Sequence, residues 1–160
     1  MIIENYKTRF LSEKDITEIM NLFRSTILNV NTKDYTIEEA EDWASCGDNI
    51  ERWKELLSSN RFIGAFDKQG SLVGFSSMNE EGYLHSMFVH KDRQGKGVAT
   101  LLLSEVENMA KEFGVKEITS EVSITARPFF EKCGYVVIKY QKHRAKELEL
   151  TNFVMNKNLI

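Results

Sequence analysis

The sequence has few of the residues that mark chain breaks, cross-links or membrane spans. Proline occurs once, at Pro128, and no stretch is rich in proline, glycine and serine, so no interdomain linker is predicted. The two cysteines, Cys46 and Cys133, lack CxxC spacing, which favours unpaired thiols in a reducing cytoplasm over a disulfide or metal site. No apolar run is long enough to span a bilayer, and the first residues lack the layout of a signal peptide. We therefore expect one cytoplasmic domain over residues 1–160, with no metal and no membrane partner.

An excess of basic residues is also missing. The formal net charge is −3, which argues against nucleic acid as the main partner. The apolar fraction of 42% and the charged fraction of 28% are ordinary for a globular protein. A chain of 160 residues is long enough to bury a hydrophobic core.

The first third of the chain predicts one strand and three helices. Residues 5–11 alternate as a strand does, and Ser12 and Thr36 each open a capping box that predicts a helix start. Asp48 is expected to start the third helix. The first helix carries an apolar face at helical spacing, formed by Ile16, Ile19, Met20, Phe23 and Ile27.

The remainder predicts a sheet with one crossover. Three strands joined by short turns indicate an antiparallel meander: Phe62–Phe66, Leu72–Met78 and Tyr83–Val89. A helix from Val98 to about Phe113 then requires the strand Glu117–Val122 to lie parallel to Tyr83–Val89. A short helix capped by Thr125 and two closing strands follow, Tyr135–Gln141 and Leu148–Met155, as a hairpin around His143–Lys146.

A glycine-rich turn between the third strand and the long helix indicates an anion site. Gly95 and Gly97 let backbone amides approach a ligand, and the first amides of the helix are unpaired and electropositive. A Rossmann turn would require a doubly wound parallel sheet, which an antiparallel meander excludes. A Walker P-loop is excluded because Lys96 lies between the glycines. A glycine turn without a ligand is the remaining alternative.

The segment Gln94-Gly-Lys-Gly-Val-Ala99 resembles the Q/R-x-x-G-x-G/A signature of the GNAT superfamily of acyl-CoA N-acyltransferases. Two further segments are similar to GNAT motifs, the strand Leu84–Asp92 and the later Ala126–Tyr135. The resemblance covers nearly the whole chain and is close to a branch of uncharacterised bacterial GNAT proteins. It implies an α/β (α+β) fold with a mixed, mostly antiparallel sheet of about six to seven strands, a splayed parallel pair and flanking helices.

The resemblance also implies a site for acetyl-CoA, or coenzyme A. The turn would hold the pyrophosphate, and the strand before it would pair with the pantetheine arm and polarise the thioester carbonyl through the N–H of Val89, or of Phe88 if a bulge shifts the register. Ser123 replaces an asparagine common in relatives, and its hydroxyl either bonds the arm or caps the next turn. The expected cofactor residues are Met87, Phe88, Val89, Gln94, Gly95, Lys96, Gly97, Val98, Ala99, Thr100, Ser123, Ala126, Phe129 and Phe130.

The acid–base residues depart from the family pattern. Phe130 stands where many relatives carry a tyrosine that protonates the CoA sulfur, and Tyr83 stands where many carry a glutamate base. Strand alternation predicts His85 on the same face as Tyr83, with Met87 and Val89 beyond. His85 has a suitable pKa for a general base, directly or through water, although an ordinary hydrogen-bonded histidine explains it equally.

Other candidates for proton transfer are less specific. Tyr140 or Tyr135 could replace the missing acid, and Glu80 and Glu81 could bind a cationic amine. The candidate catalytic residues are therefore His85, Tyr83, Tyr140 and Val89.

The resemblance implies transfer of an acetyl group to a primary amine by direct attack, with a small molecule or a peptide as acceptor. The first helices and the last hairpin should wall the acceptor pocket with Phe23, Tyr35 and Trp43. A homodimer is possible, because the last strand of such sheets often meets a second subunit. The alternative is an acyl-CoA-binding module of the same fold without catalysis, which Phe130 favours.

Overall fold

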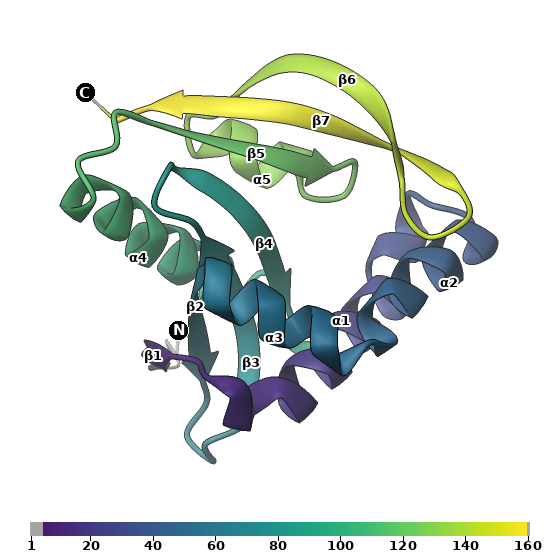
Figure 1. Ribbon diagram of the computed structural model, residues 1–160, viewed down its shortest axis with the longest axis horizontal. Coiled ribbons are helices and arrows are strands. Elements are labelled where there is room, and N and C mark those ends of the chain that lie inside the picture. The colour runs from purple at the N-terminus through teal and green to yellow at the C-terminus, as the bar shows by residue number, and fades with distance from the viewer. Residues whose placement is uncertain (1–4, 160) are drawn as a thin grey trace.

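A single seven-stranded sheet forms the centre of the protein in a computed structural model that describes residues 5–159 (Figure 1). Its strands lie in the order β1-β2-β3-β4-β5-β7-β6. β4 and β5 are parallel and every other neighbouring pair is antiparallel, as the sequence predicts. The strands are β1 Lys7–Phe10, β2 Arg61–Phe66, β3 Leu72–Met78, β4 Tyr83–Val89, β5 Glu117–Ser123, β6 Val136–Arg144 and β7 Glu149–Asn158.

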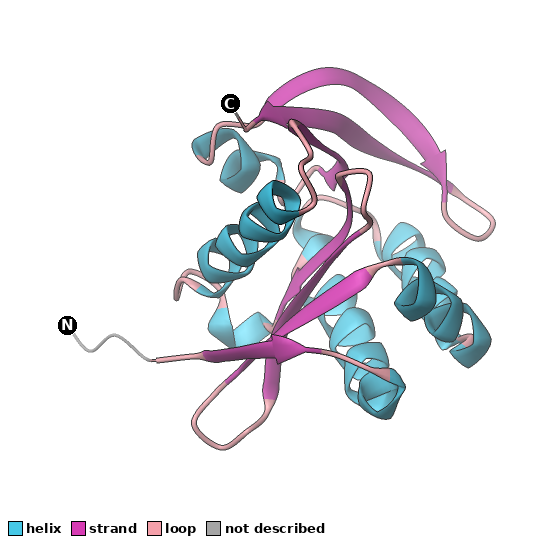
Figure 2. Ribbon diagram, turned by 60° about the vertical axis from the view of Figure 1, so that its left-hand side comes forward, coloured by secondary structure: helices cyan, strands magenta, loops and turns pink. Residues whose placement is uncertain are grey.

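Helices cover both faces of the sheet (Figure 2). They are α1 Ile16–Asn29, α2 Ile37–Ser45, α3 Ile50–Ser59, α4 Val98–Glu112 and α5 Arg127–Lys132. Two apolar clusters result, one between the sheet and α4 with α5, the other between the sheet and α1 to α3. None of the helices within residues 5–159 has the length and apolar character needed to cross a bilayer.

Two of the predicted helix starts need correction. Both capping boxes form, but the third helix begins after Asn49 rather than Asp48, because the Asn49 side chain accepts from the N–H groups of Glu51 and Arg52. The cap of the short helix α5 also differs. The hydroxyl of Ser123, not Thr125, accepts from the N–H of Ala126 at 3.1 Å, so Ser123 fixes the turn after β5.

A bulge in β4 changes which faces its residues occupy. Ser86 pairs with Ser77, but the next pair is Leu84 with Met78, which leaves His85 as an extra residue. His85 lies on the same face as Tyr83, as alternation predicts, and the centroids of the two rings are 6.2 Å apart. The prediction that Met87 and Val89 share that face is wrong, because both pack into the apolar cluster beneath α4.

The closing hairpin is longer than the sequence predicts. β6 and β7 pair from Val136 to Arg144, so the turn lies at residues 145–148 and not at His143–Lys146. The carboxylate of Asp42 in α2 accepts from the N–H groups of Lys146, Glu147 and Leu148 at 2.9–3.1 Å. This contact joins the tip of the hairpin to α2.

Candidate functional site

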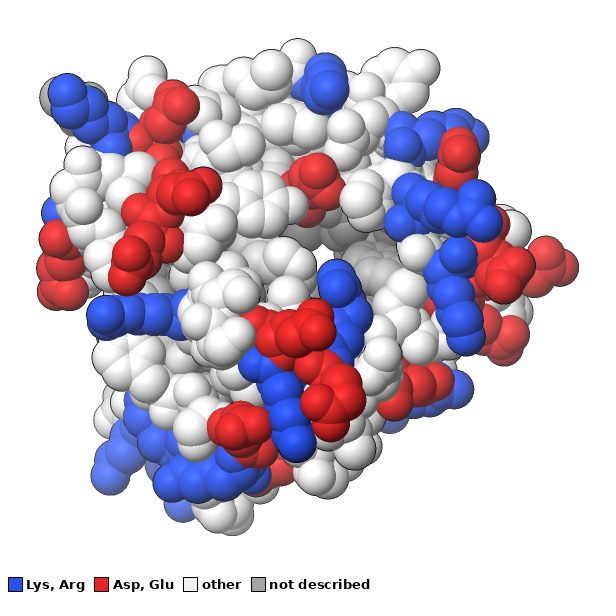
Figure 3. Space-filling model, viewed as in Figure 1, with Lys and Arg blue, Asp and Glu red and all other residues white. Residues whose placement is uncertain are grey.

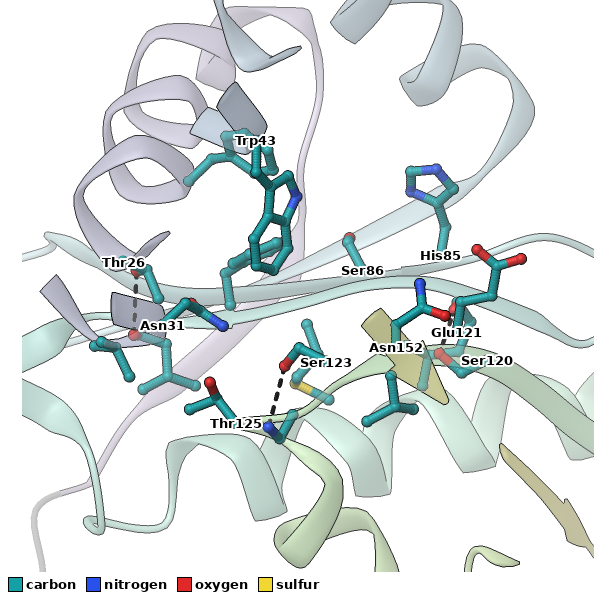
Figure 4. A pocket seen from close by; sticks show the side chains of 18 of the residues that line it. Thr26, Asn31, Trp43, His85, Ser86, Ser120, Glu121, Ser123, Thr125 and Asn152 are labelled. Carbon is teal, nitrogen blue, oxygen red and sulfur yellow. Dashed lines mark hydrogen bonds between the residues drawn. The ribbon is translucent and has the colours of Figure 1, made fainter. Parts of the chain in front are cut away.

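A cavity of about 1130 Å³ opens where β4 and β5 separate. The two strands pair only at Tyr83 with Thr119 and Leu84 with Ser120, and then diverge. Side chains from α1 to α3, from the loop before α4, from α5 and from the β6–β7 hairpin complete the walls. Figure 3 shows the hollow in the surface, and Figure 4 shows polar side chains directed into it from several elements.

The glycine-rich turn forms one end of the cavity. Gly95 and Gly97 have φ values of +70° and +86°, which favour glycine, and a Cβ added to either would meet no atom within 4 Å. Gly97 is the N-cap of α4, so the first amides of a helix of 15 residues face open space. A ligand with several negatively charged oxygens fits this end of the cavity.

Side chains of the turn itself hold it in place. The Gln94 side chain donates to the carbonyl of Val89 at 2.7 Å, and Arg93 pairs with the buried carboxylate of Asp67 at 3.2 Å. Hydrogen bonds from the N–H groups of Ser71 and Gln69 and from Arg93 lower the pKa of Asp67. The turn is therefore fixed to β4 and to the β2–β3 turn before any ligand binds.

The backbone of β4 presents N–H groups to the gap between the strands. The N–H of His90 donates to the carbonyl of Val73 in β3 at 2.8 Å. In an antiparallel pair, every second residue directs its N–H to the partner strand. Phe88 therefore bonds to β3 as His90 does, whereas the N–H groups of Met87 and Val89 point away from β3, toward the gap. Phe88 is therefore not available as the alternative donor that the sequence left open, and Val89 and Met87 are.

His85 lies at the other end of the gap. Its Nδ1 atom is buried and has no hydrogen-bond partner among residues 5–159. Burial lowers the pKa of His85, Arg52 lowers it further, and Glu121 acts in the opposite direction. The imidazole is consequently neutral at neutral pH and has a free lone pair available to accept a proton.

Tyr83 lies beside His85 and keeps its proton. Burial and the nearby carboxylate of Glu121 raise the pKa of Tyr83 to about 12. The site thus contains a base and a neutral acid on neighbouring residues of one bulged strand.

The sequence prediction missed three polar residues at this end of the cavity. Glu121 projects from β5 and lies 3.6 Å from Nδ1 of His143, and the buried Oδ1 of Asn152 has no partner among residues 5–159. Figure 4 shows Glu121 and Asn152 at the same end of the cavity as His85. The alternation of β5 was the available signal, because Ile118, Ser120 and Val122 are buried and Glu121 must face the other way.

The aromatic residues predicted for the acceptor pocket line the cavity. The ring centroid of Phe88 lies 4.9 Å from that of Phe23 and 6.1 Å from that of Trp43, and the centroids of Trp43 and Tyr35 are 5.7 Å apart. The hydroxyl of Tyr35 donates to the carbonyl of Thr151 and accepts from the N–H of Ile124, which ties this wall to β7 and to the end of β5.

Three predicted residues lie away from the acid–base position or from the cavity. Tyr140 is 69% exposed on β6 and does not line the cavity, and Lys96 points to solvent beside the turn. Tyr135 is buried against Phe130 and donates to Glu107 at 2.9 Å, so it belongs to the core. We therefore withdraw Tyr140 as a candidate acid.

The α5 side of the gap is apolar. Ala126, Phe129 and Phe130 line the cavity, and Phe130 is almost fully buried between Phe129 and Tyr135. Ser123 lines it too, although its hydroxyl accepts from Ala126. Within residues 5–159, no group of His, Cys, Asp and Glu side chains could hold a metal ion.

Comparisons with known proteins agree with this architecture. The chain is 28% identical over 154 residues to the uncharacterized N-acetyltransferase YafP of Escherichia coli K12, covering 96% of each protein. A crystal structure described as a GCN5-related N-acetyltransferase, aminotransferase class-II, from Rhodopseudomonas palustris has a TM-score of 0.94 at 29% identity and 99% coverage of both chains.

A second solved structure shares the fold. It is the PaiA N-acetyltransferase of Thermoplasma acidophilum in complex with coenzyme A, with a TM-score of 0.78, 20% identity and coverage of 96% of this chain and 99% of that one. The family model described as an acetyltransferase (GNAT) domain matches residues 31–157, which is most of the sequence. The chain therefore belongs to the GNAT family of acetyltransferases.

Proposed function

We propose that the protein transfers an acetyl group from acetyl-CoA to a primary amine by direct attack of the amine on the thioester. The observation that carries this proposal is the single cavity that joins the β4–β5 gap to the N-terminus of α4. The coenzyme A complex of PaiA, which has the same fold, supports it.

The residues at the turn fit the pyrophosphate of acetyl-CoA. The space above Gly95 and Gly97 is open, and the N–H groups at the start of α4 converge on it. The pantetheine arm would lie between the N–H groups of β4 and the apolar side of α5 at Ala126 and Phe129. When bound, acetyl-CoA supplies an acetyl group activated as a thioester.

The N–H of Val89 is the proposed donor to the carbonyl oxygen, with Met87 as the neighbouring choice. The carbonyl of Val89, in the next peptide unit, accepts from Thr26 and Gln94, which restrains this end of β4. A fixed N–H stabilises the oxygen as it gains negative charge, without reorganisation.

His85 is the proposed general base. A protonated amine is not nucleophilic, and the neutral imidazole accepts its proton directly or through a water molecule. Tyr83, which stays protonated, is the proposed donor to the departing thiolate.

A thiol-release assay with acetyl-CoA and a library of primary amines tests the function. We expect release of CoA with at least one amine, together with the acetylated amine by mass spectrometry. Acetyl-CoA binding with no thiol release across the library would instead support a non-catalytic binding module, which Phe130 favours because it has no proton to donate to the sulfur.

A further inference from the structure

One part of the cavity wall carries basic side chains. Arg52 from α3 and Arg144 and Lys146 from the hairpin line it, and we call these three residues the basic wall. None of the three forms an ion pair with a carboxylate within residues 5–159. Figure 3 shows basic side chains beside the hollow, with acidic side chains between them and at the outer edge.

Two members of the basic wall act electrostatically on other residues of the cavity. Arg52 lies near enough to His85 to lower the pKa of the imidazole. Burial raises the pKa of the Cys46 thiol, which lines the cavity with Arg52 and Lys146, and the charges of both cations oppose that effect. Asp42 is also near Lys146, but its carboxylate accepts from three backbone N–H groups of the hairpin.

The opposite side of the same space accepts hydrogen bonds. The carboxylate of Glu121, the buried Oδ1 of Asn152 and the free Nδ1 of His85 all lie at the reacting end. These atoms suit the N–H groups of an amine, whereas the guanidinium groups of the basic wall suit a carboxylate. The two ends of the space therefore require opposite charges from the molecule that fills it.

Building on the proposed acetyl transfer, we propose that the acceptor is a small zwitterion, a primary amine that also carries a carboxylate. Its amine lies toward His85 and Glu121, and its carboxylate lies against Arg52 and Arg144. Arg52 and His85 line the same cavity, so one small molecule such as an amino acid can reach both. The aromatic rings of Tyr35 and Trp43 line the same cavity and offer an apolar surface to the carbon atoms of the acceptor.

Calorimetry on the CoA-loaded protein tests this assignment without relying on turnover. The probes are α-, β- and γ-amino acids, each compared with its primary amide and with the amine that lacks the carboxyl group. At least one amino acid should bind about tenfold or more tightly than both of its counterparts, since hydrogen bonds to a charged group are lost in each.

Variants locate the carboxylate. Arg52→Gln and Arg144→Gln should each weaken that amino acid about tenfold while leaving the affinity for CoA unchanged, which also shows that the variants fold. Arg127→Gln is the matched control, because Arg127 bonds Glu131 on α5 outside the cavity. Equal affinity for amino acid, amide and amine, absence of binding by all of them, or unchanged selectivity in both variants would overturn the proposal.

Failure of the acceptor assignment is distinguishable from failure of the function. Acetylation of carboxylate-free amines as fast as amino acids would reject the zwitterion and leave the acetyl transfer standing. Binding of an amino acid without thiol release from acetyl-CoA would reject the transfer and leave the binding site standing.

Discussion

His85 has an unusual combination of burial and freedom. Its Nδ1 atom is hidden from bulk solvent, yet no residue in the described part of the chain bonds to it. Such an atom costs stability unless a ligand or water satisfies it, and functional sites are where that cost is tolerated. This argues for a role in the reaction and against an ordinary hydrogen-bonded histidine.

His85→Ala tests that role. We expect kcat to fall about a hundredfold or more at neutral pH, because the base is lost, while the affinity for acetyl-CoA stays the same. In the unchanged protein, activity should fall on the acid side only below the usual histidine pKa, since the pKa of His85 is lowered. Rates measured from pH 5 to 9 check this, and a variant with the same pH–rate profile would remove His85 from the mechanism.

Tyr83→Phe tests the acid. Removal of the hydroxyl should reduce kcat about tenfold to a hundredfold with little change in KM, because the phenol acts on the leaving group only. A fall in rate above about pH 12 cannot be measured on a folded protein, so the variant and not the pH profile is the useful measurement. A larger KM with unchanged kcat would make Tyr83 a binding residue instead.

Among the elements, the start of α4 is the one on which the proposed ligand depends most. Gly97→Glu places a carboxylate in the open space above the turn and opposes the phosphates, so acetyl-CoA binding should fall at least a hundredfold in calorimetry. Gly70→Glu is the matched control, because Gly70 has a similar φ of +81° and equally open surroundings in a turn outside the cavity. Equal loss of affinity in both variants would mean that backbone strain, and not the phosphate site, is responsible.

The contact between α2 and the hairpin tip holds the acceptor side together. Burial would raise the pKa of Asp42, but hydrogen bonds from the hairpin N–H groups outweigh it, and the pKa is lowered. The contact is therefore fully formed above the pKa of an unfolded aspartate and is lost as the pH falls through the lowered value. Asp42→Ala should accelerate hydrogen exchange at Lys146–Leu148 at neutral pH. The control variant Glu41→Ala, at the exposed neighbouring residue, should not.

The elements that the sequence predicts well are those decided locally. The spacing of apolar residues and the turn residues predicted the strands and α-helices to within a few residues. The strand–helix–strand connection predicted that β4 and β5 are parallel. A bulge in this strand was considered, but its position at His85 could not be predicted, because no glycine marks it and the pairing with β3 decides it. The hairpin turn was also misplaced, since Asp42, about a hundred residues earlier, satisfies its N–H groups.

At the scale of the whole molecule, the sheet separates the two apolar clusters, and β4 and β5 are paired only at Tyr83 with Thr119 and Leu84 with Ser120. A ligand that fills the gap contacts both halves. Membership of the GNAT family and the turn that carries its motif were predictable from residues close together in sequence. The basic wall was not, because Arg52 and the hairpin residues Arg144 and Lys146 are far apart in the sequence and only the fold brings them to one cavity.

Acetyl-CoA should therefore stabilise the whole fold and not only the turn. A ligand at a hundred times its Kd adds about 2.7 kcal/mol to the free energy of unfolding, so thermal denaturation should move upward with concentration. Gly97→Glu should show no such shift at the same concentrations, while Gly70→Glu should. A ligand-independent melting temperature in the unchanged protein would contradict the proposed cofactor.

The extra residue in β4 interrupts the alternation of side chains along the strand. After the added position, Met87 and Val89 face α4 instead of the side that Tyr83 and His85 occupy. Substitution of His85 leaves the number of residues in β4 unchanged. The acid–base chemistry can therefore change while the N–H groups of Met87 and Val89 stay in place for the acyl donor.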